Sequence, residues 1–198
     1  MSEHAVGKRH PLLMYRRTLD RLWPSLVLLG AICLVLWAWS FWGKTELIPP
    51  AEAPWLFFAG ALLTLLGVVF ILLRFAAYVQ AHRDHLRLVT PFLQTRISYR
   101  RIRAVHPVDM NSLFPPNRIS WVKRGYLEPF YGRTAVVVEL HGYPLPLAVL
   151  RLFLGWAMFY RQGEGFILLV PDWMAFSTEL DTLRTRWLEM QKRRQSAY

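Results

Sequence analysis

Two long apolar runs constrain this chain more than any other feature of its sequence. The runs cover residues 25–42 and 55–73, and neither contains a charged residue. As helices, each is roughly 27–28 Å long, which matches the hydrocarbon core of a bilayer. A buried core helix and a cleaved signal peptide are the alternatives. Both are disfavoured, because core helices seldom lack a polar face and no small-residue cleavage site follows the first run. The sequence therefore predicts a transmembrane hairpin over residues 23–73.

The distribution of basic residues predicts how this hairpin is oriented. Residues 1–22 carry five Lys or Arg residues, whereas residues 43–54 carry only Lys44. Further arginines follow the second run, beginning with Arg74. Because Lys and Arg stay on the cytoplasmic side of a membrane, both termini are predicted to be cytoplasmic. Residues 1–22 are then a basic cytoplasmic segment, and residues 43–54 lie on the opposite side.

The net charge of +11 is consistent with this topology. A basic residue beside anionic headgroups contributes about 1 kcal/mol to membrane association, so an excess of arginine is expected on the cytoplasmic side. The charge by itself therefore does not predict nucleic-acid binding. The single cysteine, Cys33, falls inside the first apolar run, which excludes a disulfide framework and a thiolate metal site.

Residues 74–198 are sufficient for one small domain, and their first part has the pattern of short β-strands. In the segment "RISYRRIRAV" the apolar residues change parity between Tyr99 and Ile102. A continuous strand would turn its apolar residues to the wrong face after this point. A helical turn or bulge at 99–101 restores the register and leaves the arginines on the opposite face.

Two buried strands and a terminal helix are predicted in the rest of the domain. The strands cover residues 134–140 and 166–170. The spacing of Thr178 and Asp181 is typical of a capping box at the start of the helix. Apolar residues then recur on one stripe of the helix: Leu180, Leu183, Trp187 and Met190.

Two stretches of this domain have no single interpretation. Residues 109–133 contain several Pro and Gly residues and are predicted to be a long irregular segment. Residues 144–162 are predicted to form a strand and a short interfacial helix, whose apolar side chains point toward lipid. Those side chains are Leu152, Phe153, Leu154, Trp156 and Phe159. A helix that covers the sheet and a third span are the alternatives.

Several of these motifs together resemble bacterial PH-like domain membrane proteins. The resemblance includes the hairpin, then "LRLVTPF" at 86–92, the apolar pattern of 97–105, and the strand that ends at Pro171–Asp172. It does not extend over insertions at about 111–133 and 150–165. The resemblance implies a membrane hairpin followed by an α+β, mainly β, PH-like domain at 74–198. That domain is a strongly bent, seven-stranded antiparallel sheet or open barrel capped by the C-terminal helix. The family also implies a binding or assembly role at the bacterial inner membrane.

The sequence contains no recognisable catalytic, metal-binding or cofactor-binding motif, so no enzyme activity, metal or cofactor is predicted. The candidate functional region is instead a mixture of aromatic and basic residues, which suits an anionic membrane surface or an acidic protein. Folding of this region back onto its own sheet and stacking on single-stranded nucleic acid are the alternatives. The candidate residues are Arg96, Arg100, Arg101, Arg103, Trp121, Lys123, Arg124, Tyr126, Arg151 and Trp156.

These features favour a non-catalytic binding or scaffolding module that is anchored in the cytoplasmic membrane. Its expected partners are the bilayer, with its anionic headgroups, and a protein or a second copy of the chain; nucleic acid is not expected. The alternative function is an accessory subunit or assembly factor of a larger membrane complex. In that case Gly30, Gly60 and Gly67 would allow the spans to approach neighbouring helices closely.

Overall fold

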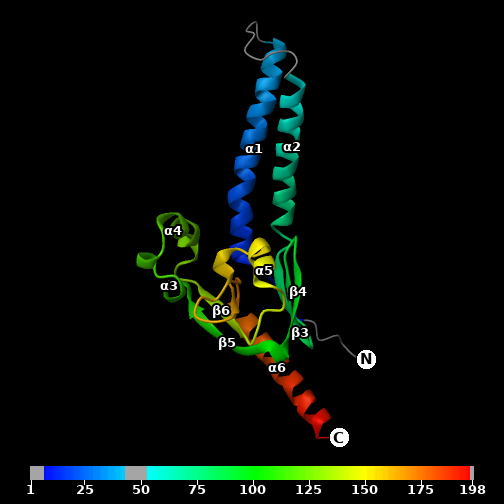
Figure 1. Cartoon of the computed structure of the whole chain (residues 1–198), viewed down its shortest axis with the longest axis vertical. Helices are drawn as coiled ribbons and strands as arrows, with labels where there is room; N and C mark the ends of the chain where they lie inside the picture. Colours follow the sequence, from blue (N-terminus) through cyan, green and yellow to red (C-terminus); the bar gives the residue numbers. More distant parts are fainter. Residues whose placement is uncertain (1–6, 43–52, 197–198) are drawn as a thin grey trace. The chain divides into compact units, whose positions relative to one another are not determined.

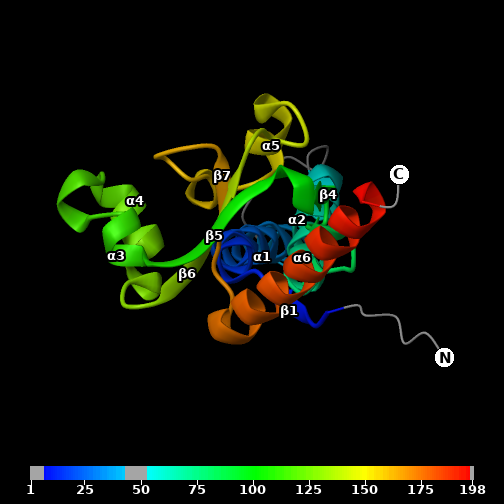
Figure 2. The same cartoon turned by 90° about the horizontal axis from the view of Figure 1, so that it is seen from below.

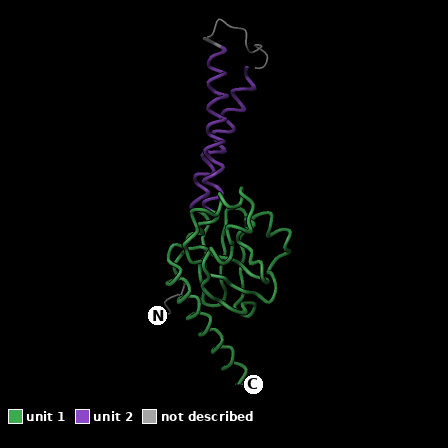
Figure 3. The backbone as a smooth tube through the Cα atoms, turned by 90° about the vertical axis from the view of Figure 1, so that its left-hand side faces the viewer, with its two compact units in different colours: residues 1–15, 76–198 green, residues 16–75 purple. Residues whose placement is uncertain are grey.

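The structure is a computed structural model that describes residues 7–42 and 53–196 (Figure 1). The chain forms two compact units, which are coloured separately in Figure 3. One unit combines Met1–Tyr15 with Ala76–Tyr198, and the other is the intervening segment Arg16–Phe75. Most of the connection predicted at 43–54 lies outside the described residues.

The segment Arg16–Phe75 consists of two paired helices, α1 (Leu13–Trp42) and α2 (Ala53–Leu73), the first of which begins in the other unit. Both helices are long and apolar enough to cross a membrane, as predicted. The first helix begins twelve residues before the predicted span at residue 25. The additional turns are basic, and Nη1 of Arg74, just after α2, lies 3.1 Å from Oδ1 of Asp20 in these turns.

The two helices approach each other closely at glycines. A Cβ atom at Gly30 would lie 2.5 Å from Oγ1 of Thr64 and 2.9 Å from the backbone oxygen of Gly60. A Cβ atom at Gly60 would lie 3.0 Å from the backbone oxygen of Gly30, and one at Gly67 would lie 2.5 Å from a methyl group of Val27. Gly30, Gly60 and Gly67 therefore form the contact between α1 and α2. From the sequence alone, the same glycines are expected to let neighbouring helices approach the spans.

The other unit contains two antiparallel sheets, which are separate and not closed into a barrel. The first sheet has four strands in the order β1-β2-β3-β4, and the second has three in the order β5-β6-β7. In the first sheet, β3 and β4 bury alternate residues, whereas in the second sheet β6 and β7 each bury four consecutive residues. The strands are β1 (Arg9–Pro11), β2 (Tyr78–Ala81), β3 (His85–Val89), β4 (Gln94–Ser98), β5 (Ile102–Asp109), β6 (Thr134–Leu140) and β7 (Gly165–Leu168).

Strand β1 lies within the predicted basic segment 1–22 and belongs to the first sheet. It pairs with β2, and His10 lies opposite Val79. The hairpin is thus inserted between two neighbouring strands of one sheet. A three-residue strand that contains Pro11 has no recognisable alternation, and its partner lies beyond the hairpin in the sequence. The local pattern therefore gives no sign of this pairing.

The predicted register break is confirmed. Tyr99–Arg101 form a single 3₁₀ turn, η1, between β4 and β5, and the pairing of β5 with β6 shifts between Ile102 and Ala104. Tyr99 is buried, and its hydroxyl donates a hydrogen bond to the backbone oxygen of His82. The turn therefore keeps Ile97 of β4 and Ile102 of β5 buried on either side of it and leaves Arg96, Arg100, Arg101 and Arg103 exposed.

Helix α6 (Trp173–Gln195) contacts β2 of the first sheet and both β5 and β6 of the second (Figure 2). Its predicted stripe faces inward, since Leu180 and Leu183 are buried. The prediction that a capping box at Thr178 starts this helix is wrong, because α6 begins five residues earlier, at Trp173. Asp172 is its N-cap and accepts a hydrogen bond from the backbone N–H of Ala175 at 3.0 Å.

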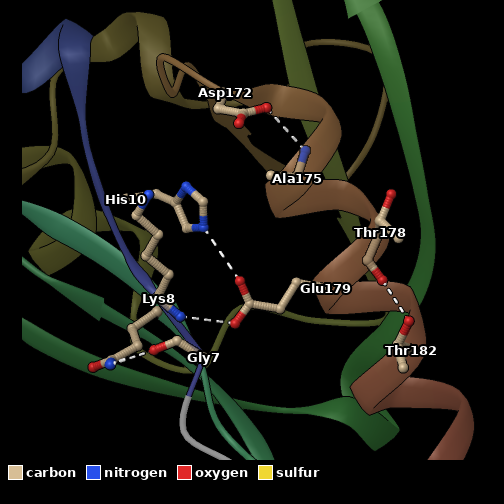
Figure 4. A network of polar contacts seen from close by, with 9 residues as sticks. Gly7, Lys8, His10, Asp172, Ala175, Thr178, Glu179 and Thr182 are labelled. Carbon is tan, nitrogen blue, oxygen red and sulfur yellow. Dashed lines mark hydrogen bonds and ion pairs between the residues drawn. The ribbon is translucent and has the colours of Figure 1, made fainter.

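A polar network attaches β1 to α6 (Figure 4). The backbone N–H of Lys8 donates to Oε1 of Glu179 at 2.9 Å, and Nε2 of His10 lies 3.3 Å from Oε2 of the same residue. The imidazole of His10 is buried and also packs edge-on against Phe176. A Cβ atom at Gly7 would overlap the Glu179 carboxylate, so only glycine allows this approach. One carboxylate thus attaches the strand before the hairpin to the last helix.

We expect the turn between β2 and β3 to make stability depend on pH. The imidazole of His82 stacks on that of His85 with ring centroids 4.8 Å apart. Desolvation, and then repulsion from His85 and Arg87, lower the pKa of His82 below its ordinary value of 6.5, against an opposing effect of Asp84. The unfolded chain then binds the proton more readily, so stability falls as the pH decreases through 6.5.

Thermal unfolding of the full-length protein in micelles at about pH 7.5 and about pH 5.5 measures this dependence. His82→Gln should reduce the loss of stability on acidification. Gln is suitable because the Tyr99 hydroxyl binds the backbone oxygen of residue 82, not its side chain. An unchanged pH dependence in this variant would exclude the contribution of His82.

Candidate binding surface

The segment between β5 and β6 is helical rather than irregular. It forms four short helices, and its prolines lie at helix starts, where the missing backbone N–H costs no hydrogen bond. Pro116 begins one 3₁₀ turn, and Pro129 is in the first residues of another. The sequence prediction failed because it took these prolines as breaks only. The helices are α3 (Met110–Leu113), η2 (Pro116–Arg118), α4 (Trp121–Leu127) and η3 (Glu128–Phe130).

An aromatic and basic cluster, which we call the Trp156 cluster, joins α4 to η4 (Trp156–Met158). Nζ of Lys123 lies 5.1 Å from the centre of the Trp156 ring, and the Tyr126 ring centre lies 6.1 Å from it. On the same indole, the ring of Phe114 packs edge-on at 5.7 Å and the guanidinium of Arg161 lies at 5.8 Å. Three predicted candidates, Lys123, Tyr126 and Trp156, are therefore brought together from positions up to 33 residues apart.

The cluster is attached to the body of the unit on one side. Phe114, Leu127 and Phe130 are almost completely buried. The hydroxyl of Tyr126 donates to the backbone oxygen of Met14 at 2.8 Å, in the first turn of α1. The alternative in which this segment folds back onto its own domain is thus correct for these residues.

The start of α4, in contrast, is exposed to solvent. Trp121 is 86% exposed and Val122 is 60% exposed, although both are large and apolar. Basic side chains surround them in sequence, because residues 118–133 carry four Lys or Arg residues and one carboxylate, Glu128. Arg124, another predicted candidate, is exposed on the same helix. An exposed indole in a basic segment suits an anionic surface, since the ring inserts while the cations pair with phosphate or carboxylate groups.

The ambiguous stretch 144–162 contains α5 (Leu147–Phe153) and η4. A helix of seven residues is too short to span a bilayer, which excludes the third span. Leu154 and Phe159, predicted to face lipid, are buried within the unit instead. Leu152 is 77% exposed beside the exposed candidate Arg151. The stretch therefore packs mainly onto its own domain, because Leu150, Leu154, Ala157, Met158 and Phe159 are all buried.

The four remaining candidates lie on β4, η1 and β5, and all are exposed. The side chain of Arg101 donates to the backbone oxygen of Tyr143 at 3.2 Å. The backbone oxygen of Arg103 accepts a hydrogen bond from Arg184 of α6 at 2.9 Å. Arg96 and Arg100 extend from the face opposite the buried side chains of the same run. All four arginines are exposed, as the sequence predicts, but they lie on other elements than the Trp156 cluster.

Two members of the Trp156 cluster, Phe114 and Arg161, were not predicted from the sequence. Phe114 lies in "SLFPP" and Arg161 follows the apolar stretch, and neither position has a motif that signals a ring contact. Within residues 7–42 and 53–196, no group of three or more His, Cys, Asp or Glu side chains is arranged to hold a metal ion.

Comparison of the chain with protein-family models, with curated proteins and with solved structures gave no match in any of the three.

Proposed function

We propose that this chain is a membrane-anchored PH-like module with a binding or scaffolding role at the cytoplasmic face of a bacterial inner membrane, and that it is not an enzyme. The two apolar helices support the anchor, and the basic residues on both sides of the hairpin support cytoplasmic termini. Support for a PH-like fold comes from the four-stranded and three-stranded antiparallel sheets followed by a helix that contacts both. Six of the seven strands, β2 to β7, lie within residues 74–198, where the resemblance implies a seven-stranded sheet, and the seventh, β1, precedes the hairpin.

The exposed Trp121 carries the proposal of a binding role. An indole that is 86% exposed gains free energy when a partner buries it, and Trp121 is held on a helix whose other side is fixed by buried residues. The rigid attachment through Tyr126 and Leu127 lowers the entropy lost when the surface binds. The basic residues around it favour an anionic bilayer surface as the partner.

Nucleic acid fits this surface less well. Single strands bind to successive exposed rings on which bases stack. In the described part of this segment, Phe114 and Phe130 are buried and the ring of Tyr126 packs against Trp156, which leaves Trp121 as its most exposed ring. One exposed indole provides a point of insertion but no stacking platform.

Site-specific photo-cross-linking in native membranes tests this function. A photoreactive amino acid at position 121 should give lipid adducts, because the indole is expected to insert between headgroups. The same amino acid at the exposed Thr185 of α6 is the matched control. Equal cross-linking at the two positions would contradict a binding role of α4.

The same experiment separates the proposed function from its alternative. An accessory subunit or assembly factor should give a single protein adduct of fixed mass at position 121. A product of twice the mass of the chain would instead indicate self-association. Gly30, Gly60 and Gly67, which would allow helices of other proteins to approach, instead form the contact within the hairpin. The accessory-subunit alternative therefore depends on detecting such a protein adduct.

A further inference from the structure

Two arginines meet on one exposed phenyl ring at the end of the hairpin. The guanidinium carbon of Arg16 lies 5.4 Å from the ring centre of Phe75, and that of Arg74 lies 5.1 Å from it. The ring itself is 67% exposed. Both cations are thus held at one place by cation–π contacts instead of moving freely in water.

The length of α2 sets the depth at which Arg16, Arg74 and Phe75 lie in a bilayer. Its 21 residues span about 31 Å, which is the thickness of the hydrocarbon core. Arg74 and Phe75 follow its last residue directly. They therefore lie at the level of the headgroups, where aromatic rings and arginines are enriched.

The charges in this group are not balanced. Asp20 is the only carboxylate among residues 16–22 and 74–75, against four arginines. Asp20 pairs with Arg74, and the ion pairs of the described residues do not include Arg16. The Nε of Arg74 is buried and has no hydrogen-bond partner among the described residues. The group has a net positive charge, and the guanidinium of Arg16 lies outside those ion pairs.

We infer that Arg16, Arg74 and Phe75 form a binding site for the phosphate group of an anionic membrane phospholipid. A planar guanidinium donates two parallel hydrogen bonds to the two non-bridging oxygens of a phosphodiester, and a second guanidinium on the same ring adds a further donor and positive charge. The Phe75 ring contacts the glycerol and the first acyl carbons. The Asp20 carboxylate holds the guanidinium of Arg74 in place without cancelling the charge of Arg16. The site rests on the membrane insertion in the proposed function, but not on any role of α4.

Native mass spectrometry of the full-length protein tests this site. The protein is incorporated into vesicles of phosphatidylglycerol and phosphatidylcholine, extracted in a mild detergent, and analysed for bound phosphatidylglycerol. Arg16→Gln should lower the retained lipid about tenfold, as expected for the loss of a charge-assisted pair of hydrogen bonds. Arg16→Lys keeps the charge but not the planar fork and should give an intermediate loss. Arg17→Gln is the matched control, because Arg17 is exposed and makes neither ring contact nor ion pair among those of the described residues.

Each outcome decides between specific binding and its alternatives. An equal loss in Arg16→Gln and Arg17→Gln would mean diffuse attraction by charge and would overturn the site, as would no loss in either. Displacement of the lipid by millimolar inorganic phosphate would show a free-anion site instead of a lipid site. If Arg16→Gln does not fold, Phe75→Leu removes the shared ring and tests the same contact.

A carbonate-extraction assay on the same membranes separates this inference from the proposed function. Protein released by carbonate is not integrated in the membrane, and both proposals then fail. Protein that is integrated but retains lipid equally in all variants contradicts the phosphate site alone.

Discussion

Replacement of Gly30 by leucine should separate the two helices of the hairpin. The first added carbon would overlap the Thr64 hydroxyl and approach the Gly60 backbone oxygen to 2.9 Å. A side chain can rotate away, but the backbone of α2 cannot, so the helices must move apart. Overpacking of this kind costs about 1–3 kcal/mol, and the lost close contact adds to it because helix association in lipid depends on tight packing.

Distances between spin labels in the two helices measure this separation. Labels on Leu28 and Leu66, in a Cys33→Ser background, should give a longer and broader distance distribution in Gly30→Leu. Ala61→Leu is the control, since Ala61 is exposed beside the buried Gly60 and the same side chain then adds volume away from the contact. An unchanged distribution in Gly30→Leu would show that the glycines do not determine the helix packing.

Replacement of Glu179 by alanine should release β1 from the rest of its unit. The change leaves the backbone N–H of Lys8 and the buried imidazole of His10 without their acceptor. An unsatisfied buried donor costs about 1–3 kcal/mol, and Glu179 is partly exposed, so we expect a loss of about 2 kcal/mol in the free energy of unfolding.

Amide hydrogen exchange and thermal unfolding of the full-length protein in micelles measure this effect. Exchange should become faster in β1 and in its partner β2 than in the second sheet. Asp181→Asn, two residues away on the same helix, is the matched control. Partial desolvation raises the pKa of Asp181, against an opposing effect of Arg184, so its ionised form does not contribute favourably and its removal should not destabilise the fold. Equal effects of the two changes would exclude a specific role of Glu179.

The candidate surface was only partly predictable from the sequence. The mixture of rings and cations in residues 118–133 indicated the correct segment, and the arginines of β4 and β5 are exposed as the parity of that run requires. The sequence did not show which rings are available. Trp121 and Phe130 have similar apolar character, yet one is 86% exposed and the other is 5% exposed. That difference depends on which side of each of the two short helices, α4 and η3, is buried within the unit.

The sequence by itself determined the features that have a local period or length. These include two helices of membrane-spanning length, the turn at Tyr99–Arg101 that corrects the strand parity, the buried strand Thr134–Leu140 and the inner stripe of α6. Each follows from the spacing of apolar residues within one element, because a helix repeats every 3.6 residues and a strand every two.

Only the tertiary structure showed how these elements are joined. It placed β1 beside β2 across the inserted hairpin, moved the N-cap of α6 to Asp172, and brought His10 to Glu179 across 169 residues. The Trp156 cluster and the Arg16–Arg74 contact on Phe75 also join separate elements. Such contacts are fixed by which surfaces are buried against each other in space. Because residues distant in the chain leave no common local pattern, the sequence alone does not specify them.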